Sequence, residues 1–197
     1  MVLPPLRRTA VKHKINPMKI YTKVGDKGRT RLADGRAAVK CHPRLEALGD
    51  LDELSAVLGW AITLDDASSE QDILENTQKD LFELGAALAG GKRGQAFWKE
   101  VAQDTARLER IIDAWIKDLP PLKNFVLPGG SPAGAALHMA RTVCRRAERA
   151  AAALSLEEPL PHEALAYLNR LSDFLFVMAR RVNEREYRPE PPWKPLT

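Results

Sequence analysis

Residues 124–154 read N-F-V-L-P-G-G-S-P-A-G-A-A-L-H-M-A-R-T-V-C-R-R-A-E-R-A-A-A-A-L, and the organisation of the chain follows from this stretch. It starts as an apolar loop, turns on Gly129-Gly130 and continues through Ser131-Pro132. Serine is favoured at a helix N-cap, and proline is favoured at the first helical position. The stretch therefore predicts a long helix that begins directly after Ser131.

Charged side chains recur along this helix. Arg141, Arg145 and Glu148 are spaced i, i+4 and i+7, so they share one face. The other faces are apolar or rich in alanine. Such a stripe is typical either of a solvent-facing side or of the floor of an anion site, and periodicity alone leaves both readings open.

The composition describes one globular domain. The chain has 197 residues, of which 45% are hydrophobic and 28% are charged, which is enough for a sizeable core. No window approaches the roughly 18 apolar residues of a membrane span, so no membrane association is expected. Two cysteines, Cys41 and Cys144, are too few for a disulfide framework, which favours a reducing compartment such as the cytoplasm.

The net charge of +4 comes from the start of the chain. Residues 1–19 contain five of the 30 basic residues and no acidic one, which leaves 25 basic against 26 acidic residues for the rest. We predict a basic, disordered extension over residues 1–18. It has no apolar core of a signal peptide, and it is poor in serine for a transit peptide. Contact of this tail with nucleic acid is a weaker alternative.

Four further segments follow the 3.6-residue period of amphipathic helices. They span 43–64, from 68–70 to Gly90-Gly91, from near Phe97 or Asp104 to Pro120-Pro121, and onward from Pro161. Proline-rich residues 188–197 are not expected to be helical. The pattern predicts an all-α protein, a helical bundle of antiparallel neighbours.

A glycine-containing segment precedes the first helix. Residues 24–32, V-G-D-K-G-R-T-R-L, combine two glycines with cations and threonine, a composition that suits a polyphosphate. The Walker A pattern is absent. A plain surface turn is the competing interpretation of G-D-K-G.

Several polar residues lie next to apolar positions of the predicted helices. Asp52 follows Leu45 by seven residues, so it belongs either to a solvated face or to an arginine pair. Asn169 and Asp173 stand amid leucines and phenylalanines, either as satisfied core hydrogen-bonders or as part of a ligand site between helices. The histidines and cysteines have no metal-ligand spacing, so we predict no structural zinc.

Four segments together resemble the PduO-type ATP:cob(I)alamin adenosyltransferases. They are K-I-Y-T-K-V-G-D-K-G-R-T-R-L (19–32), H-P-R-L-E-A-L-G-D-L-D-E-L-S-A-V-L-G (42–59), residues 125–149, and Y-L-N-R-L-S-D-F-L-F-V-M-A-R (167–180). The resemblance implies a five-helix bundle with a four-helix core over residues 19–187, assembled as a homotrimer with active sites at subunit interfaces. The implied activity transfers the 5′-deoxyadenosyl group of ATP to reduced cobalamin, with Mg²⁺, and releases triphosphate.

The resemblance also implies roles for individual residues. The triphosphate loop within 19–42 would comprise Thr22, Lys23, Val24, Gly25, Thr30 and Arg31, with Lys40 close by. The nucleotide would be held by Arg145, Arg146, Ala147, Glu148, Arg149 and Asn169. Arg141 would neutralise phosphates and pair with Asp52 of a neighbouring subunit, and Phe125 would lie against the lower face of the corrin. The implied catalytic set is thus Arg141, Arg145, Asp52 and Phe125.

Two departures from the family pattern stand out. Val24 replaces a threonine, which leaves the backbone donors in place, and Cys41-His42 replaces an acidic pair. The resemblance suggests a flavin reductase and an adenosylcobalamin-dependent enzyme as partners. The alternative function is a protein that binds adenosylcobalamin and delivers it to such an enzyme. No residue is assigned as a metal ligand.

Overall fold

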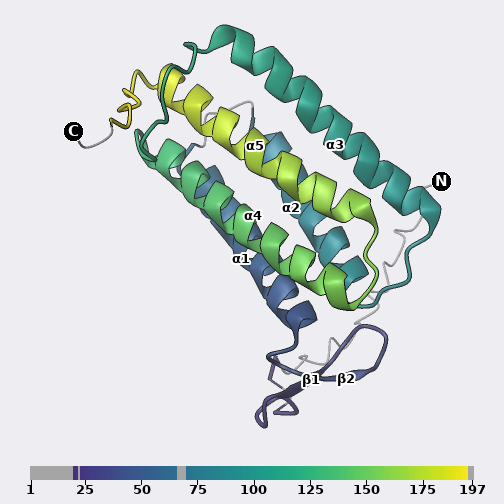
Figure 1. Cartoon of the computed structure of the whole chain (residues 1–197). Coiled ribbons are helices and arrows are strands. Elements are labelled where there is room, and N and C mark those ends of the chain that lie inside the picture. Colours follow the sequence, from purple (N-terminus) through teal and green to yellow (C-terminus); the bar gives the residue numbers. More distant parts are fainter. Residues whose placement is uncertain (1–19, 22, 66–69, 195–197) are drawn as a thin grey trace, which may run out of the picture.

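A computed structural model describes residues 20–21, 23–65 and 70–194, and five long helices make up most of this part of the chain (Figure 1). The elements are β1 (Arg29–Arg31), β2 (Ala37–Val39), α1 (Pro43–Thr63), α2 (Gln71–Leu88), α3 (Gln95–Trp115), the 3₁₀ helix η1 (Ile116–Asp118), α4 (Pro132–Glu157) and α5 (His162–Arg185). The predicted five-helix bundle is confirmed. The predicted extension 1–18 lies outside the described residues.

The helix ends follow local capping rules. Ser131 caps α4 by accepting a hydrogen bond from Gly134 N at 3.0 Å, and Pro132 begins the helix as predicted. His42 caps α1 through its Nδ1, which accepts from Arg44 N at 3.1 Å. The end of α2 is followed by Gly90 at φ +95°, a left-handed conformation that glycine adopts without a Cβ clash.

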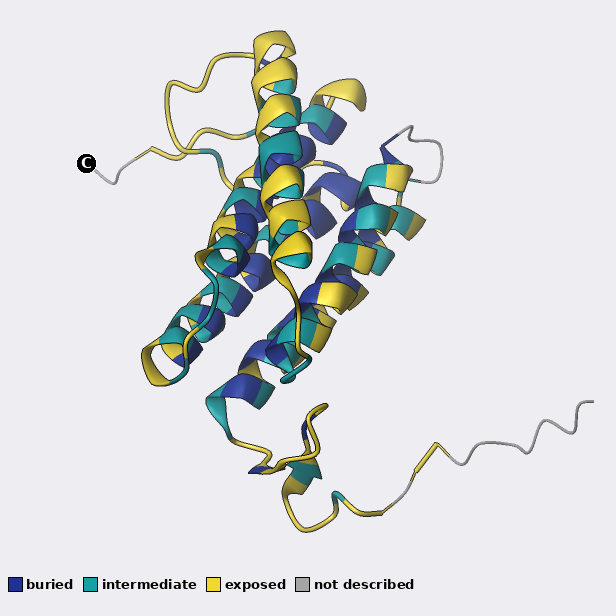
Figure 2. Cartoon of the chain, turned by 90° about the vertical axis from the view of Figure 1, so that its right-hand side faces the viewer, coloured by how far each residue is buried: buried dark blue, intermediate teal, exposed yellow. Residues whose placement is uncertain are grey.

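The core lies among α1, α2, α4 and α5, whereas α3 covers its outside. The buried cluster takes most of its members from these four helices, and α3 contributes only Leu108 to the fully buried set (Figure 2). Along α4, Ala136, Ala140 and Ala147 are fully buried, and their short side chains leave space for the larger side chains of α1 and α5. The four-helix core that the family resemblance implied is confirmed.

A small antiparallel hairpin precedes the bundle and was not predicted. In it Arg29 faces Val39 and Arg31 faces Ala37, and the chain reverses at Gly35 (φ +84°). Ala33 N donates to Ala89 O at 3.0 Å, which attaches the hairpin to the end of α2. Strands of three residues are too short to show a period in sequence, so this segment was expected to be a loop.

The start of the third helix differs from the sequence expectation, and the C-terminal segment agrees with it. The third helix begins at Gln95, ahead of both predicted starts, and is continued by η1. The predicted serine start of α2 falls in residues 66–69, outside the described residues, and Glu70 is the N-cap. Residues 188–194 are not helical, as predicted, and they run beside the loop after η1 through a bridge between Val126 and Pro192. The described helices include none that is long and apolar enough to cross a membrane.

Candidate active site

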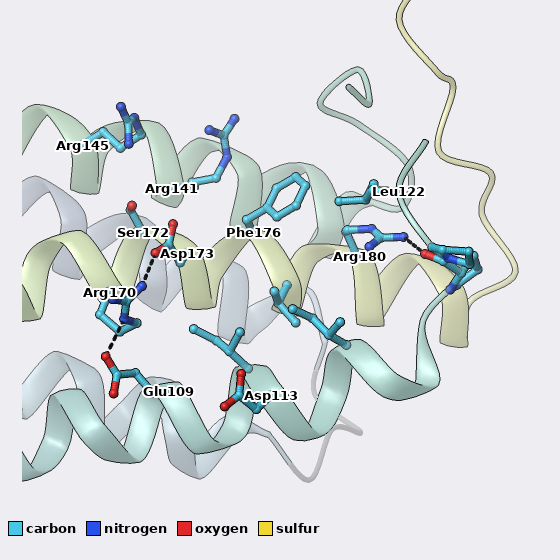
Figure 3. A pocket seen from close by; sticks show the side chains of 15 residues that line it. Glu109, Asp113, Leu122, Arg141, Arg145, Arg170, Ser172, Asp173, Phe176 and Arg180 are labelled. Atoms are coloured by element: carbon cyan, nitrogen blue, oxygen red, sulfur yellow. Dashed lines mark hydrogen bonds and ion pairs between the residues drawn. The ribbon is translucent and has the colours of Figure 1, made fainter. Parts of the chain in front are cut away.

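A cavity of about 810 Å³ lies between α3, α4 and α5 (Figure 3). Its lining comes from α4 (Arg141, Arg145), from α5 (Arg170, Ser172, Asp173, Phe176, Val177, Arg180), from α3 and η1 (Glu109, Ile112, Asp113, Ile116) and from the following loop (Pro120, Pro121, Leu122). One part of this lining is charged. The other part, around Phe176, Ile116 and Leu122, is apolar. The cavity therefore suits a ligand with one anionic and one apolar portion.

Arg141 and Arg145 supply the free positive charge of the cavity. They lie one turn apart on α4, and neither forms an ion pair within the part of the chain that the structure describes. Burial lowers the pKa of Arg141, and the neighbouring charge of Arg145 lowers it further. A guanidinium nevertheless stays protonated at neutral pH. Arg141 Nε is buried and has no hydrogen-bond partner among the described residues. Both guanidinium groups are therefore free to bind an anionic ligand.

The other cations of the cavity are already neutralised. Arg170 binds Glu109 at 3.0 Å and Asp173 at 2.6 Å, both drawn in Figure 3. Arg180 binds Glu190 at 2.9 Å. The uncommitted charge is thus concentrated on the α4 side, and the interpretation of the charged stripe as an anion site stays a prediction.

The predicted nucleotide-binding run 145–149 is divided among the sides of α4, because successive helical residues point about 100° apart. Arg146 faces α1, where it binds Asp50 at 2.9 Å and also pairs with Glu53; these carboxylates raise the pKa of Arg146. Ala147 is fully buried and Arg149 is exposed. Only Arg145 of this run lines the cavity.

Glu148 and Asn169 connect α4 to α5 beside the cavity. Asn169 Nδ2 donates to Glu148 Oε1 at 3.0 Å, and Asn169 is exposed. Asp173 is also exposed. The interpretation of Asn169 and Asp173 as buried core hydrogen-bonders is therefore wrong. Asp173 lines the cavity, whereas Asn169 does not.

Asp52 does not line the cavity that contains Arg141. It is exposed on α1 and lines an apolar groove with residues of α2, among them Leu81 and Phe82. Within one chain Asp52 and Arg141 line separate cavities. Their pairing between subunits stays a prediction.

The N-terminal loop is folded tightly, and it lies beyond the start of α1, outside the bundle (Figure 1). Lys23 has a left-handed backbone (φ +62°), and Gly28 N donates to Gly25 O at 3.2 Å. The Lys40 ammonium lies over Gly25, so close that a Cβ at position 25 would be 3.1 Å from Lys40 Nζ. Gly25 and Lys40 thus come together, and we call this segment, which also contains Lys23, the cationic loop. Thr22 lies outside the described residues.

The remaining loop residues are less clustered. Val24 is exposed, Thr30 is half-buried in β1, and Arg31 donates from Nη1 to Gly35 O at 3.1 Å. None of the described loop residues lines the cavity that contains Arg145. One chain therefore does not bring the predicted triphosphate loop and the arginine pair together.

Comparisons with known proteins show the family of the chain. The family model for cobalamin adenosyltransferases matches residues 20–182. The corrinoid adenosyltransferase of Bacillus subtilis (strain 168) is 42% identical over 175 residues, which cover 85% of this chain and 88% of the relative. This chain belongs to the cobalamin adenosyltransferase family. The PduO corrinoid adenosyltransferase of Citrobacter freundii is also 42% identical, but the match covers 83% of this chain and 49% of that relative, so the chain spans about half its length.

Solved structures of the family have the same fold as this adenosyltransferase family member. A phenylalanine-to-histidine variant of a PduO-type ATP:corrinoid adenosyltransferase from Lactobacillus reuteri, complexed with cobalamin and ATP, has a TM-score of 0.81 at 37% identity. That match covers 89% of this chain and 97% of the other. An arginine-to-lysine variant of the same enzyme complexed with ATP has a TM-score of 0.80 at 38% identity, and covers 89% and 100%.

Sequence reasoning missed several residues that line the cavity. Arg180 is buried although it is charged, and Glu109 reaches the cavity from a helix that carried no site prediction. A detectable signal existed for Arg180, since it follows Val177-Met178-Ala179 on the apolar side of α5. No pattern in α3 distinguishes Glu109 from the other charged residues on that helix. Its role depends on how α3 packs against α5.

The burial of His138 predicts that the folded protein loses stability in acid. His138 is 3% exposed, its Nδ1 has no partner among the described residues, and burial followed by the charge of Arg141 lowers its pKa from 6.5 to about 4. The unfolded chain therefore binds the proton more tightly. Stability from this group is complete above pH 6.5 and is lost as the pH falls towards 4, by roughly 2–3 kcal/mol.

Urea unfolding of wild type and His138→Gln between pH 4 and 7 measures this effect. We expect the wild type to lose more stability than the variant over this interval, because glutamine does not titrate. Identical pH slopes for the two proteins would exclude His138 as the cause. His162, which is exposed, provides the matched control as His162→Gln.

Proposed function

We propose that this chain transfers the 5′-deoxyadenosyl group of ATP to the cobalt of reduced cobalamin and releases triphosphate. The observation that carries the proposal is the uncommitted pair Arg141 and Arg145, which lines a cavity of about 810 Å³ together with apolar side chains of η1, α5 and the loop after η1. This arrangement fits a substrate pair that combines a polyphosphate with a large apolar ring. Family membership and the relatives complexed with cobalamin and ATP support the same assignment.

The chemistry requires alignment and charge stabilisation. Cobalt in the +1 state uses its electron pair to attack ribose C5′, the Co–C bond forms, and the C5′–O bond breaks with its electrons remaining on triphosphate. No proton is transferred in this step, so the protein supplies no general base. It must hold cobalt and carbon in line and stabilise the negative charge that grows on the leaving oxygen. Arg141 and Arg145 are the groups that we assign to that charge.

Phe125 has a separate role in our proposal, in the preceding reduction. The ring is 81% exposed on the loop that leaves the apolar end of the cavity. An apolar side chain under the corrin excludes the lower axial ligand and leaves Co(II) four-coordinate, which makes it easier to reduce to Co(I). The effect stabilises one state more than the other, which is the requirement for acceleration.

We further propose that each active site combines two copies of the chain in a homotrimer. The cationic loop with Lys23 and Lys40 lies outside the bundle of its own chain and does not line the cavity with Arg145. Asp52 and Arg141 likewise line separate cavities. Supply of the loop and of Asp52 by a neighbouring copy would complete the site.

Mg²⁺ would be bound mainly by the triphosphate in this proposal. The described residues contain no cluster of three or more histidine, cysteine, aspartate or glutamate side chains that could hold a metal ion. Mg²⁺ typically keeps several waters and binds through substrate phosphates with few protein ligands, so this chain fits a metal carried by the nucleotide.

A spectrophotometric assay tests the proposed function. Purified chain, ATP, Mg²⁺ and chemically reduced cobalamin should yield adenosylcobalamin, followed by the absorbance change of cobalt–carbon bond formation. Omission of ATP is the control. Tight binding of adenosylcobalamin without any turnover would reject the transferase and favour a delivery protein.

Mixed oligomers test the shared site. Lys23→Ala and Arg145→Ala chains should each be inactive alone. Co-expression with two different tags, followed by purification on both, selects mixed trimers. Each mixed trimer contains one interface that receives both wild-type residues, so about a third of the wild-type activity should return. Activity no higher than that of the single variants would place both residues in one chain's site and overturn the shared arrangement.

A further inference from the structure

The loop between η1 and α4, residues 119–131, which we call the Phe125 loop, poses a positional problem. Phe125 is 81% exposed, so packing does not fix its ring. The nearest aromatic neighbour is Trp193, whose ring centroid is 6.5 Å away. The position of Phe125 must therefore follow from the backbone of the loop, and the contacts that hold this backbone decide where the ring lies.

A buried asparagine of α5 holds the end of the loop that leads into α4. Asn183 is 1% exposed. Its Oδ1 accepts from Ser131 N at 3.0 Å, and its Nδ2 donates to Gly129 O at 2.9 Å. Both halves of the amide are thus used on the loop. Ser131 in turn caps α4, so the amide fixes the loop against the start of the helix that carries Arg141.

The Asn183 amide explains why glycine occupies positions 130 and 134. A Cβ at Gly130, which has φ +103°, or at Gly134 would overlap the Asn183 side chain. The pattern G-G-S-P-A-G therefore leaves space for Asn183 as well as forming a turn. The sequence pattern and the buried amide form one unit.

A buried arginine holds the other end of the loop. Arg180 is 4% exposed, its Nη2 donates to Pro120 O at 2.7 Å (Figure 3), and its Nε binds Glu190 at 2.9 Å. Glu190 begins a stretch that pairs with the middle of the loop. Leu127 N donates to Pro191 O at 2.9 Å, and Trp193 N donates to Phe125 O at 2.7 Å.

We infer that Arg180 and Asn183 are positioning residues that act through the backbone of the Phe125 loop. This inference rests on the proposed function, because it assigns to Phe125 the exclusion of the lower cobalt ligand. Arg180 fixes the loop directly at Pro120 and indirectly through Glu190, and Asn183 fixes it at Gly129 and Ser131. Loosening either end lets Phe125 move, and an axial ligand then returns to Co(II).

The test compares two starting materials in one protein. Transferase rates are measured from Co(II)cobalamin with a one-electron reductant such as reduced flavin, and from cobalamin already reduced to Co(I). For Asn183→Asp, which keeps the acceptor but loses the donor to Gly129, we expect at least a fivefold larger loss from Co(II) than from Co(I). Electron paramagnetic resonance of the variant with bound Co(II)cobalamin and ATP should show less of the four-coordinate species than in the wild type. The KM for ATP should stay within about twofold of the wild-type value.

A second variant covers the case in which Asn183→Asp does not fold. Glu190→Gln removes the charge of the carboxylate that binds Arg180, in a segment outside the helical core, and should give the same selective loss, more weakly. The matched control Glu186→Gln, an exposed residue of the same region, should leave both rates unchanged. Equal losses from Co(II) and Co(I), or reduced stability with an unaltered Co(II) spectrum, would reduce these contacts to a structural role and overturn the inference. An inactive wild type would overturn the proposed function and the inference together.

Discussion

Replacement of Arg145 by alanine should lower kcat for adenosyl transfer by about 100-fold or more, since loss of one preorganised donor to a developing charge costs this much in other enzymes. Arg145 lines the cavity and has no ion pair among the described residues, so its charge is free to act on a ligand. The helical circular dichroism should not change, because the side chain is exposed and supports no other element.

Two further variants make the Arg145 result specific. Arg145→Lys keeps the charge without the planar, two-pronged donor set, so it should recover only part of the activity. Arg110→Ala removes an exposed arginine of α3 that does not line the cavity, and it should leave turnover unchanged. Unaltered turnover in Arg145→Ala would mean that the cavity is not the site of triphosphate departure.

Replacement of Phe125 by alanine should affect turnover from Co(II) more than turnover from Co(I). Turnover from Co(II) should fall by about tenfold or more, because a returning axial ligand stabilises Co(II) and each 1.4 kcal/mol of barrier is a factor of ten. Turnover from pre-reduced Co(I) should fall much less, since reduction has already taken place. Both rates are read in the same absorbance assay.

Leu127→Ala is the matched control for Phe125→Ala. Leu127 is 48% exposed on the same loop, and its backbone N–H, which bonds Pro191 O, is retained in the variant. Its rates from Co(II) and Co(I) should change little and in equal proportion. If Phe125→Ala reduced the two rates equally, the ring would have no special function in the reduction step.

The helical architecture could be predicted from sequence because it rests on strong local signals. Apolar residues at helical spacing predicted α1, α2, α3 and α5. The predicted start of α4 at Ser131-Pro132 was confirmed by its capping hydrogen bond. The hairpin Arg29–Val39 escaped prediction, because its strands are short and depend on attachment to Ala89 at the end of α2. Such a long-range contact leaves no periodic pattern in the local sequence.

The site was predictable only in part. Arg141 and Arg145 share a face by simple helix geometry, and the cavity contains both. The same geometry separates Arg146 from them, and a rotation of 100° per residue would have indicated this before the structure. The relation of Lys23 to Arg145 could not be derived, since one chain does not bring them to one surface.

The fit between Asn183 and the glycines of the Phe125 loop constrains how this sequence can change. Any side chain introduced at Gly130 or Gly134 must displace an amide that lies about 50 residues further along the chain. A smaller residue at position 183 would make room for a side chain at Gly134 but would leave Ser131 N and Gly129 O without their partner. At Gly130 the backbone conformation, φ +103°, would remain unfavourable for any other residue. Single substitutions at these positions are therefore costly, and only concerted exchanges offer an alternative packing of this corner.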